Sequence, residues 1–224
     1  MPLHQAPPPA PPAPPAPARV LRSLRLWFDS AAAAPANDAD ADRVDWLRVL
    51  PFVLLHLGCA GVIWVGVSPV ALLVAVALYA LRMFAITGFY HRYFSHRSFR
   101  TSRGLQFVFA LIGAASVQRG PLWWAAHHRH HHRYADQAQD PHSPRHGFWR
   151  SHMGWFMTPR AFATDLSRVQ DLARYPELRW LDRYDVAVPL AMAIALYATG
   201  ALLQHLWPAL DTSGAQLLVW DSSF

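Results

Sequence analysis

Ten of the 13 histidines in this 224-residue chain lie in its central part, where they form two dense groups. The first group is a HxxxxH pair, His91 and His96. The second contains a HxxHH pattern, His128, His131 and His132. Imidazole nitrogen is a borderline ligand that binds Fe, Zn, Cu and Ni, and no thiol lies nearby to indicate structural zinc. The two groups therefore predict a metal site made of histidines.

The spacing within each group leaves the geometry of this site open. Residues three and four apart share one face of an α-helix, so His128, His131 and His132 can converge. The set His127, His130 and His131 satisfies the same rule. The HxxxxH pair is separated by about one and a half helical turns, so its two rings do not share a face of an α-helix. They can still converge if the helix end frays or if two metals share the cluster.

Long apolar segments place these histidines beside a membrane. The chain is 53% hydrophobic and only 15% charged, against about a quarter charged in soluble domains. Leu47 to Val67, Val70 to Gly88 and Val186 to Trp207 are each long enough to cross a hydrocarbon core of about 30 Å. Leu105 to Val117 is too short to span it and is expected at the interface. We therefore predict an all-α integral membrane bundle with three transmembrane helices, interfacial helices and a histidine-rich cap.

The arginines set the expected orientation of this bundle. The chain has no Lys, and most of its Arg residues lie between positions 91 and 185. By the positive-inside rule, this segment and the N-terminus are cytoplasmic. The Arg-rich and Ala-rich composition suggests a bacterial source, so we predict a protein of the bacterial inner membrane. Sequence motifs typical of nucleic-acid binding do not occur, and no nucleic-acid partner is expected.

The chain is expected to have three parts. Residues 1–18 are rich in Pro and Ala, which predicts a disordered tail. Residues 19–42 combine an amphipathic segment, typical of a helix at the membrane interface, with a polar linker. Residues 43–224 make up the domain that contains the two histidine groups.

The segment from Phe89 to Trp155 resembles the membrane acyl-CoA desaturases of the stearoyl-CoA, or Δ9, type, and the likeness extends over roughly residues 45–210. The matching motifs are His91-Arg92-Tyr93-Phe94-Ser95-His96, His128-Arg129-His130-His131-His132-Arg133-Tyr134, Asp140-Pro141-His142, Gly147-Phe148 and Ser151-His152-Met153-Gly154-Trp155. The positions of the downstream motifs favour a second box that begins at His128. The resemblance thus selects His128, His131 and His132 over the alternative set.

This resemblance implies a non-haem di-iron site at the cytoplasmic face. Its ligands in this chain would be His91, His96, His128, His131 and His132. It also implies an oxidoreductase that uses O2 to remove hydrogens from two adjacent carbons of a saturated acyl-CoA. The product has a cis double bond, commonly at Δ9. The electrons would come from a carrier such as cytochrome b5, a ferredoxin or a fused reductase.

Three residues are expected to contact the substrate, and the resemblance implies the first two of them. Gln118 and Trp124 match groups that shape the bend of the acyl tunnel, although Trp124 would also suit a belt of aromatic residues at the interface. Arg129, within the Arg-rich second box, would meet the phosphates of coenzyme A, although membrane topology explains the same arginines. His142 and the histidines after it are expected to form hydrogen bonds around the ligands instead of binding metal.

One part of the family pattern does not occur in this sequence. Family members have a third HxxHH box after a fourth span, whereas the only histidine after His152 is His205, inside the third apolar segment. With three spans and a cytoplasmic N-terminus, the chain would end on the outer face. Trp220 to Phe224 does not continue the apolar pattern expected of a fourth span. The chain is therefore expected to be an incomplete desaturase with little or no activity by itself.

Three other functions remain open at this point. A related di-iron membrane hydroxylase would carry the same boxes and would form a hydroxyl group instead of a double bond. A metal transporter would need metal-binding groups within the spans, where we find only His56 and His205, far apart in sequence. A non-catalytic remnant would bind one metal or fewer per chain, which a measurement of bound iron would detect.

Overall fold

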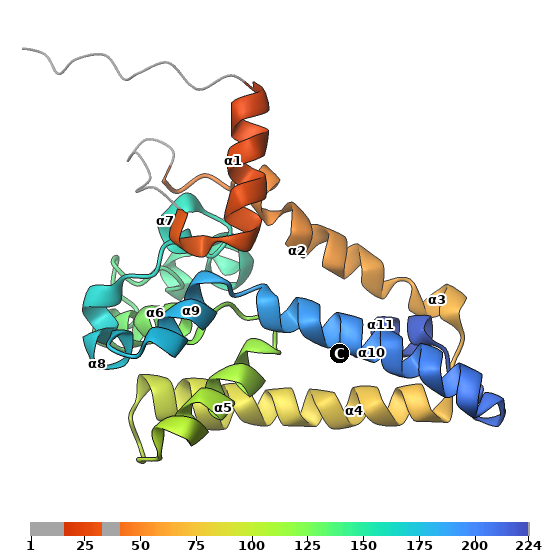
Figure 1. Cartoon of the computed structure of the whole chain (residues 1–224). Helices are drawn as coiled ribbons and strands as arrows, with labels where there is room; N and C mark the ends of the chain where they lie inside the picture. The colour runs from red at the N-terminus through yellow and green to blue at the C-terminus, as the bar shows by residue number, and fades with distance from the viewer. Residues whose placement is uncertain (1–15, 33–40, 224) are drawn as a thin grey trace, which may run out of the picture.

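The structure of this chain is a computed structural model that describes residues 16–32 and 41–223. Within these ranges every regular element is helical, which confirms the all-α class. The α-helices are α1 (Ala16–Phe28), α2 (Trp46–Cys59), α3 (Val62–Val65), α4 (Pro69–Phe84), α5 (Arg103–Ala114), α6 (Pro121–Tyr134), α7 (Pro159–Phe162), α8 (Gln170–Ala173), α9 (Pro176–Arg183), α10 (Ala187–Leu206) and α11 (Gly214–Ser222). In Figure 1, α2, α4 and α10 extend in one direction from a cap that contains α6, α8 and α9.

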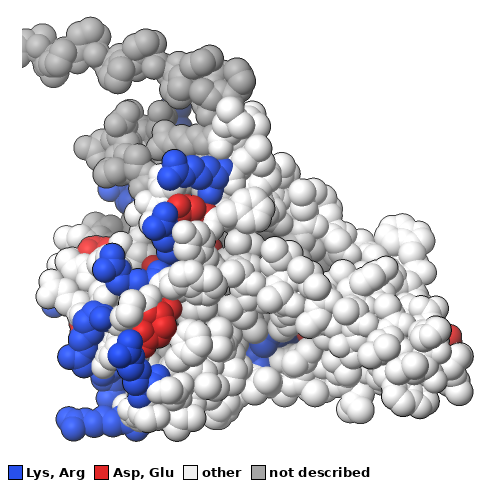
Figure 2. Space-filling view, viewed as in Figure 1, with Lys and Arg blue, Asp and Glu red and all other residues white. Residues whose placement is uncertain are grey.

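Three helical segments are long and apolar enough to cross a membrane, as the sequence predicts. They are Trp46–Val65 (α2 and α3), Pro69–Ser95 and Ala187–Leu206 (α10). The second consists of α4 followed by η2 (Ala85–Ser95), a π-helix, and therefore runs past Gly88 into the cap. Figure 2 shows Arg and acidic side chains gathered at the cap end, while the surface of the three segments is almost uniformly uncharged.

A fourth apolar helix, α11, follows the third span. The chain was expected to end on the outer face without a fourth span, and in the structure α11 turns back after α10 and packs against α10, α4 and α2. Ser213 and Gln216 form a reciprocal cap at its start. Gly200 on α10 and Gly214 on α11 allow the two backbones to meet, because a Cβ atom on Gly214 would lie 2.5 Å from the Tyr197 carbonyl oxygen. The break at Asp211 to Ser213 thus starts a further helix of the bundle, while the face on which the chain ends stays a prediction.

An ion pair joins α4 to α11 inside the apolar part of the molecule. Arg82 Nη1 lies 3.0 Å from Asp221 Oδ2, and Arg82 Nη2 donates to the Asp221 carbonyl at 3.1 Å. Both side chains are largely buried. Charged groups at membrane depth are costly unless they are paired within the protein. This pairing therefore explains how α4 can carry an arginine.

A buried apolar cluster fixes the cap to the second span. Tyr90 and Phe94 on η2 pack with Leu122 on α6 and Leu178 on α9. On α5, Gly113 lies so close to the Tyr90 ring that a Cβ atom would collide with it. Each fully buried side chain of this kind contributes about 1.5–3 kcal/mol. The cluster therefore holds η2 against α6, and these are the two elements that carry the histidine boxes.

The N-terminal helix begins earlier than expected. α1 starts at Ala16, three residues before position 19, because proline is tolerated in the first turn of a helix and Pro17 stands there. Trp27 Nε1 donates to the Leu47 carbonyl, and Asp29 pairs with Arg183 of α9. The rest of the predicted tail, residues 1–15, and most of the predicted linker, residues 33–40, lie outside the described residues.

Candidate metal centre

The HxxxxH pair lies on the π-helix η2. In a π-helix each N–H bonds to the carbonyl five residues earlier, and here the His96 N–H donates to the His91 carbonyl at 3.1 Å. Residues five apart therefore return to one side of the helix, and the two Nε2 atoms lie 3.0 Å apart. In an α-helix the two rings would not share a face, and the π-helical turn brings them together, an outcome that the sequence left open. The only signal in the sequence was the spacing of five itself.

The helix α6 carries the second box, and its start is firmly held. Pro121 occupies the first turn, and the Trp123 N–H donates to Asp182 Oδ1 at 2.6 Å. Thr164 Oγ1 donates to the other oxygen of Asp182 at 2.6 Å. Burial raises the pKa of Asp182 to about 6 despite these two hydrogen bonds. Because the first N–H groups of a helix have no partner within it, this carboxyl fixes where α6 begins.

His128 and His132, four residues apart on α6, face the HxxxxH pair. Nε2 of His128 lies 3.1 Å from Nε2 of His96, and the ligand nitrogens of all four rings lie within 4.8 Å of one another. Burial, together with the rings of His132, His91 and His96, lowers the pKa of His128 to about 3, which keeps it neutral. We call these four residues the four-histidine group. Their convergent imidazole nitrogens fit a divalent metal such as iron.

His131 points to a different place and belongs to a second group. Its Nδ1 lies 3.0 Å from Oδ2 of the fully buried Asp140, and His142 Nε2 lies 4.0 Å from Oδ1. The ligand atoms of these three residues also lie within 4.8 Å of one another. We call them the carboxylate-braced group. His131 Nδ1 thus faces Asp140, while its ring centroid lies 5.5 Å from that of His132. That all three rings of the second box bind one di-iron site stays a prediction.

Asp140 was not singled out from the sequence as a site residue. Burial alone would raise the pKa of this carboxyl, but hydrogen bonds from His131 and from the backbone N–H groups of His142 and Asp136 lower it overall. A carboxylate that accepts from the distal nitrogen of a metal-binding histidine fixes the orientation of that ring. The signal was the motif Asp140-Pro141-His142, which indicates a common turn without revealing which side chain it serves.

Stacked aromatic rings surround the carboxylate-braced group. The His142 ring stacks on His131, with centroids 4.3 Å apart, and on Trp155, with centroids 4.9 Å apart. Trp155 in turn stacks on Trp123 at the start of α6, with centroids 5.7 Å apart. His142 was expected to lie beside the ligands without binding metal. Its place in this stack is compatible with that role, although its nitrogen lies within reach of a shared ion.

The alternative register of the second box points away from both groups. His127 packs between the rings of Trp123 and Trp155, and burial lowers its pKa to about 3. His130 Nε2 donates to the Gln139 carbonyl at 2.8 Å. Neither ring faces the HxxxxH pair. The geometry therefore favours His128 and His132, but not His127 and His130, as partners of that pair.

Arg129, within the second box, reaches the end of η2 and uses all five of its N–H donors within the chain. Nε and Nη2 donate to the carbonyls of Ser95 and Phe94, at the end of η2. Nη1 and Nη2 donate to the two oxygens of Asp171, and Nη1 also donates to the Arg168 carbonyl. A substrate phosphate would have to displace one of these contacts. The predicted contact of Arg129 with substrate stays a prediction, whereas its bracing of η2 is visible.

Gln118 and Trp124 lie together beside the four-histidine group. Trp124 Nε1 donates to Gln118 Oε1 at 3.3 Å. The Trp124 ring stacks on His128, with centroids 4.7 Å apart. Trp124 is therefore in contact with a candidate ligand, as a residue that shapes a substrate tunnel should be. Neither residue's contact with an acyl chain is tested by this arrangement.

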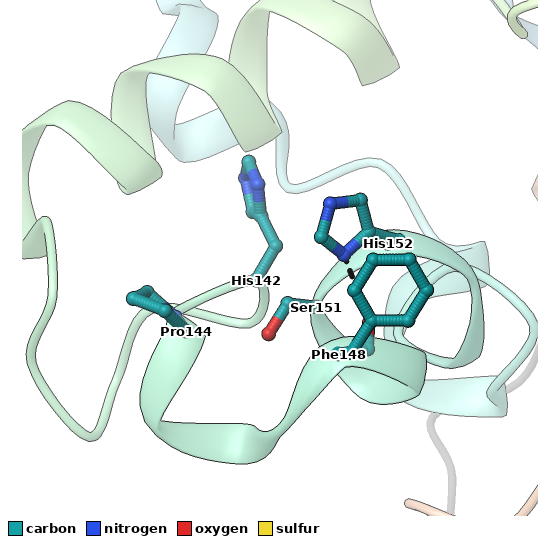
Figure 3. Close-up of a pocket in the computed structure, with 5 residues that line it drawn as sticks. All are labelled: His142, Pro144, Phe148, Ser151 and His152. Carbon is teal, nitrogen blue, oxygen red and sulfur yellow. Dashed lines mark hydrogen bonds between the residues drawn. The ribbon is translucent and has the colours of Figure 1, made fainter.

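An open hollow of about 570 Å³ adjoins the carboxylate-braced group. It is lined by His142, Pro144, Phe148, Ser151 and His152. Figure 3 shows the His142 ring on one side of this hollow and the stacked rings of Phe148 and His152 on the other. Part of the wall comes from η4 (Arg150–Gly154), a second short π-helix.

The region of this chain that matches a known protein family includes both groups. A family described as fatty acid desaturase matches residues 67–220. The palmitoyl-monogalactosyldiacylglycerol delta-7 desaturase of Arabidopsis thaliana is 38% identical over 141 residues, which cover 61% of this chain and 38% of that protein. The sn-1 stearoyl-lipid 9-desaturase of Anabaena variabilis is 33% identical over 168 residues, covering 74% of this chain and 62% of that protein.

A third relative acts, by its name, on a different acyl carrier. The acyl-CoA C20 Delta5-desaturase of Anemone leveillei is 36% identical over 138 residues, which cover 60% of this chain and 44% of that protein. The chain thus spans between 38% and 62% of the length of these three relatives. These three relatives are all named as desaturases, but their names differ in the acyl carrier and in the position of the double bond.

Proposed function

We propose, from the premise that this chain belongs to the fatty acid desaturase family, that its histidines hold a non-haem di-iron site for dehydrogenation of a saturated acyl chain. The observation that carries this proposal is the convergence of the four-histidine group at the end of an apolar span. Membership of the family makes the chain an oxidoreductase, and its three apolar helices make it a membrane protein. The iron, the acyl carrier and the double-bond position are the proposed details.

The side chains of this chain have distinct tasks in such a site. Bound iron would supply the activation of O2 that removal of hydrogen from an unactivated C–H bond requires. His128 is neutral before any metal binds, so no proton has to be released from it. Asp140 holds Nδ1 of His131, which leaves Nε2 free for a ligand bond. Trp124, stacked on His128 and bonded to Gln118, forms the wall beside which we place the reacting carbons.

The substrate and the orientation are further parts of the proposal. We propose a saturated acyl-CoA as substrate and a cis double bond at Δ9 as product, with electrons from a carrier such as cytochrome b5, a ferredoxin or a reductase. The arginines gathered at the cap end support an anionic carrier (Figure 2). The same arginines support a cytoplasmic cap in a bacterial inner membrane. Relatives named for acyl-lipids make a lipid-linked acyl chain the nearest alternative substrate.

Bound iron is the first test of this function. The chain would be purified in detergent after growth with iron, and iron and zinc per chain would be measured. Near two irons per chain is the expected result, and His128→Gln should lose most of the iron. His130→Gln, on the same helix but bonded to Gln139, is the matched control and should keep it. Zinc in place of iron would contradict the proposal, and one iron or fewer would indicate a non-catalytic remnant.

Product analysis is the second test. The chain would be expressed in a desaturase-deficient host, and the host's fatty acids would be analysed for cis-monounsaturated and hydroxylated acids. We expect little or no new cis double bond from this chain alone, because the five predicted ligands would leave two bound irons with incomplete ligand shells. Abundant Δ9 products would contradict that expectation while supporting the reaction. Hydroxylated acids would indicate the related hydroxylase.

A further inference from the structure

The hollow beside His142 leads through stacked rings to a predicted metal ligand. His142 lines the hollow and also stacks on His131, with ring centroids 4.3 Å apart. We propose that an acidic one-electron carrier protein docks at this hollow, and that its electrons reach the metal site through the rings of His142 and His131. This inference rests on the proposed function, because it needs a redox metal beside His131.

The ring stack gives a path of contacting conjugated rings from the surface to His131. Electron transfer between proteins slows steeply with the gap between donor and acceptor, so it favours places where conjugated rings are in contact. The His142 side chain is about one quarter exposed, at 28%, and the neighbouring Asp140 is fully buried. Trp155 stacks on the other face of His142, with an interplanar angle of 12°, which fixes the plane of the ring. A carrier in the hollow would touch His142 directly.

Two polar atoms of the hollow, Ser151 Oγ and His152 Nδ1, are already bonded within the chain, which leaves fewer groups to bind a substrate headgroup. Ser151 Oγ lies 2.6 Å from the Ser143 carbonyl and 2.8 Å from the Gly147 carbonyl. His152 Nδ1 lies 2.9 Å from the Phe148 carbonyl. What remains accessible is mainly ring surface, and Phe148 is 79% exposed. A large exposed aromatic side chain is typical of a protein contact.

The charges at the rim favour an acidic partner. Arg145 follows the lining residue Pro144, is exposed, and forms no ion pair with any described residue. Arg150 precedes the lining residue Ser151 and pairs with Asp42. None of the five residues that line the hollow carries a carboxylate, and Asp140, beside His142, is buried and bonded to His131. Unbalanced positive charge at a rim attracts and orients a negatively charged protein.

The two sides of the metal site then have separate uses. Trp124 and Gln118 lie against the four-histidine group, where we place the acyl chain, and the hollow lies against the carboxylate-braced group. In one turnover two carrier molecules each give up one electron. These two electrons and two protons, with the two hydrogens taken from adjacent acyl carbons, reduce one O2 to two H2O, and a C=C bond forms. The acyl chain and the electron carrier can thus be bound at the same time.

Binding of a plant-type [2Fe–2S] ferredoxin, an acidic one-electron carrier, tests the docking step. Its dissociation constant for the purified full chain would be measured at low and high salt, without substrate. Arg145→Glu should weaken binding about tenfold, equivalent to about 1.4 kcal/mol. Arg179→Glu, a charge reversal at an exposed position on α9, is the matched control and should change binding less than about twofold. Equal effects of the two variants, or binding that is insensitive to salt, would overturn the docking site.

Reduction of the loaded chain tests the electron route. Reduced ferredoxin and, separately, dithionite would be mixed with wild type, His142→Leu and His142→Phe, and the rate of metal reduction would be followed by absorbance. His142→Leu should lose most of the ferredoxin-driven rate per bound iron, while its dithionite-driven rate per bound iron should stay close to that of wild type. His142→Phe retains a stacked ring and should keep more of the rate. Wild-type ferredoxin rates in His142→Leu would overturn the route.

Two further outcomes separate this inference from the proposed function. If the chain binds no iron, the proposed function and the electron route fail together, while the effect of Arg145→Glu on ferredoxin binding still decides the docking site. If an acyl-CoA displaces ferredoxin in direct competition that Arg145→Glu abolishes, the hollow is a substrate site and the proposal is overturned.

Discussion

The four-histidine group and the carboxylate-braced group share one helix but are held in different ways. In the first, His128 and His132 of α6 meet the pair on η2, and the described part of the chain offers no hydrogen-bond partner to any of the four Nδ1 atoms. In the second, the His131 ring is fixed by Asp140 and by stacking against His142. Metal-binding histidines usually have such a partner for the distal nitrogen.

This difference indicates that the two groups respond differently to metal. Rings whose Nδ1 has no such partner are held mainly by ring contacts, such as the stacking of Trp124 on His128, so the four-histidine group depends more strongly on a bound ion to hold its shape. The carboxylate-braced group keeps its geometry through hydrogen bonds and ring contacts. The first group should therefore lose its order when metal is removed, and the second should retain it.

The largest effect is expected from breaking the four-histidine group. His96→Gln removes the ring whose Nε2 lies within 3.1 Å of both His91 and His128. We expect the variant to lose most of its iron, because the remaining imidazoles no longer surround one point. Iron per chain measured after purification checks this. Retention of wild-type iron would show that the four rings do not act together, and His152→Gln, outside both groups, serves as the control.

A smaller effect is expected from loosening the carboxylate-braced group. Asp140→Asn replaces the charged acceptor of His131 and should weaken iron binding about 10–100-fold, the usual cost of changing such a partner. Competition with a graded series of chelators measures the change. Asp136→Asn, at an exposed position in the same turn, should leave the affinity unchanged. Equal affinities for the two variants would mean that the brace has no influence on the metal.

The smallest effect is expected from a change at Asp182, which holds the start of α6, the helix that both groups share. Burial raises the folded-state pKa of Asp182 to about 6, from 3.8, so the folded chain binds more protons than the unfolded chain between these values. Stability from this group is therefore present at low pH and is lost as pH rises through 6. A pKa difference of about two units corresponds to a loss of about 3 kcal/mol in folding stability at neutral pH.

Asp182→Asn should remove this cost, because the amide oxygen can still accept from the Trp123 N–H. The difference in melting temperature between the variant and wild type should increase from pH 4 to pH 7. The iron content should be the same in the two proteins. Thermal unfolding in detergent at several pH values measures this. A constant difference across the pH range would show that the carboxyl does not titrate there, and a selective loss of iron would show that α6 does not support both groups equally.

The parts of the fold that depend on local pattern were predictable. The three spans follow from the length of their apolar runs, and the convergence of His128 and His132 follows from a spacing of four on α6. The π-helix η2 was not predictable, because its backbone bonding depends on packing of Tyr90 and Phe94 in the cap. The separation of His131 from its neighbours depends on Asp140, nine positions later, which only the folded turn brings near.

The return of the chain in α11 was missed for a related reason. Asp221 interrupts the apolar pattern, and its charge reads as the end of a membrane segment. In the structure the same charge is the partner of Arg82 on α4. Either charge alone would argue against burial, but the two charges can be buried together as an ion pair. The hydropathy of each segment taken separately does not reveal such a pair.

The π-helical stretch also bears on how the first box can change by insertion or deletion. An α-helix joins residue i to i+4, whereas η2 joins His91 to His96, so this turn contains one residue more than an α-helical turn. Loss of a single residue between the two histidines would give HxxxH, which an ordinary α-helix places on one face. The ring pair would then survive a change of length that, in a regular helix, would turn everything downstream by about 100°. Alignments of this box should therefore tolerate a one-residue gap without implying a different site.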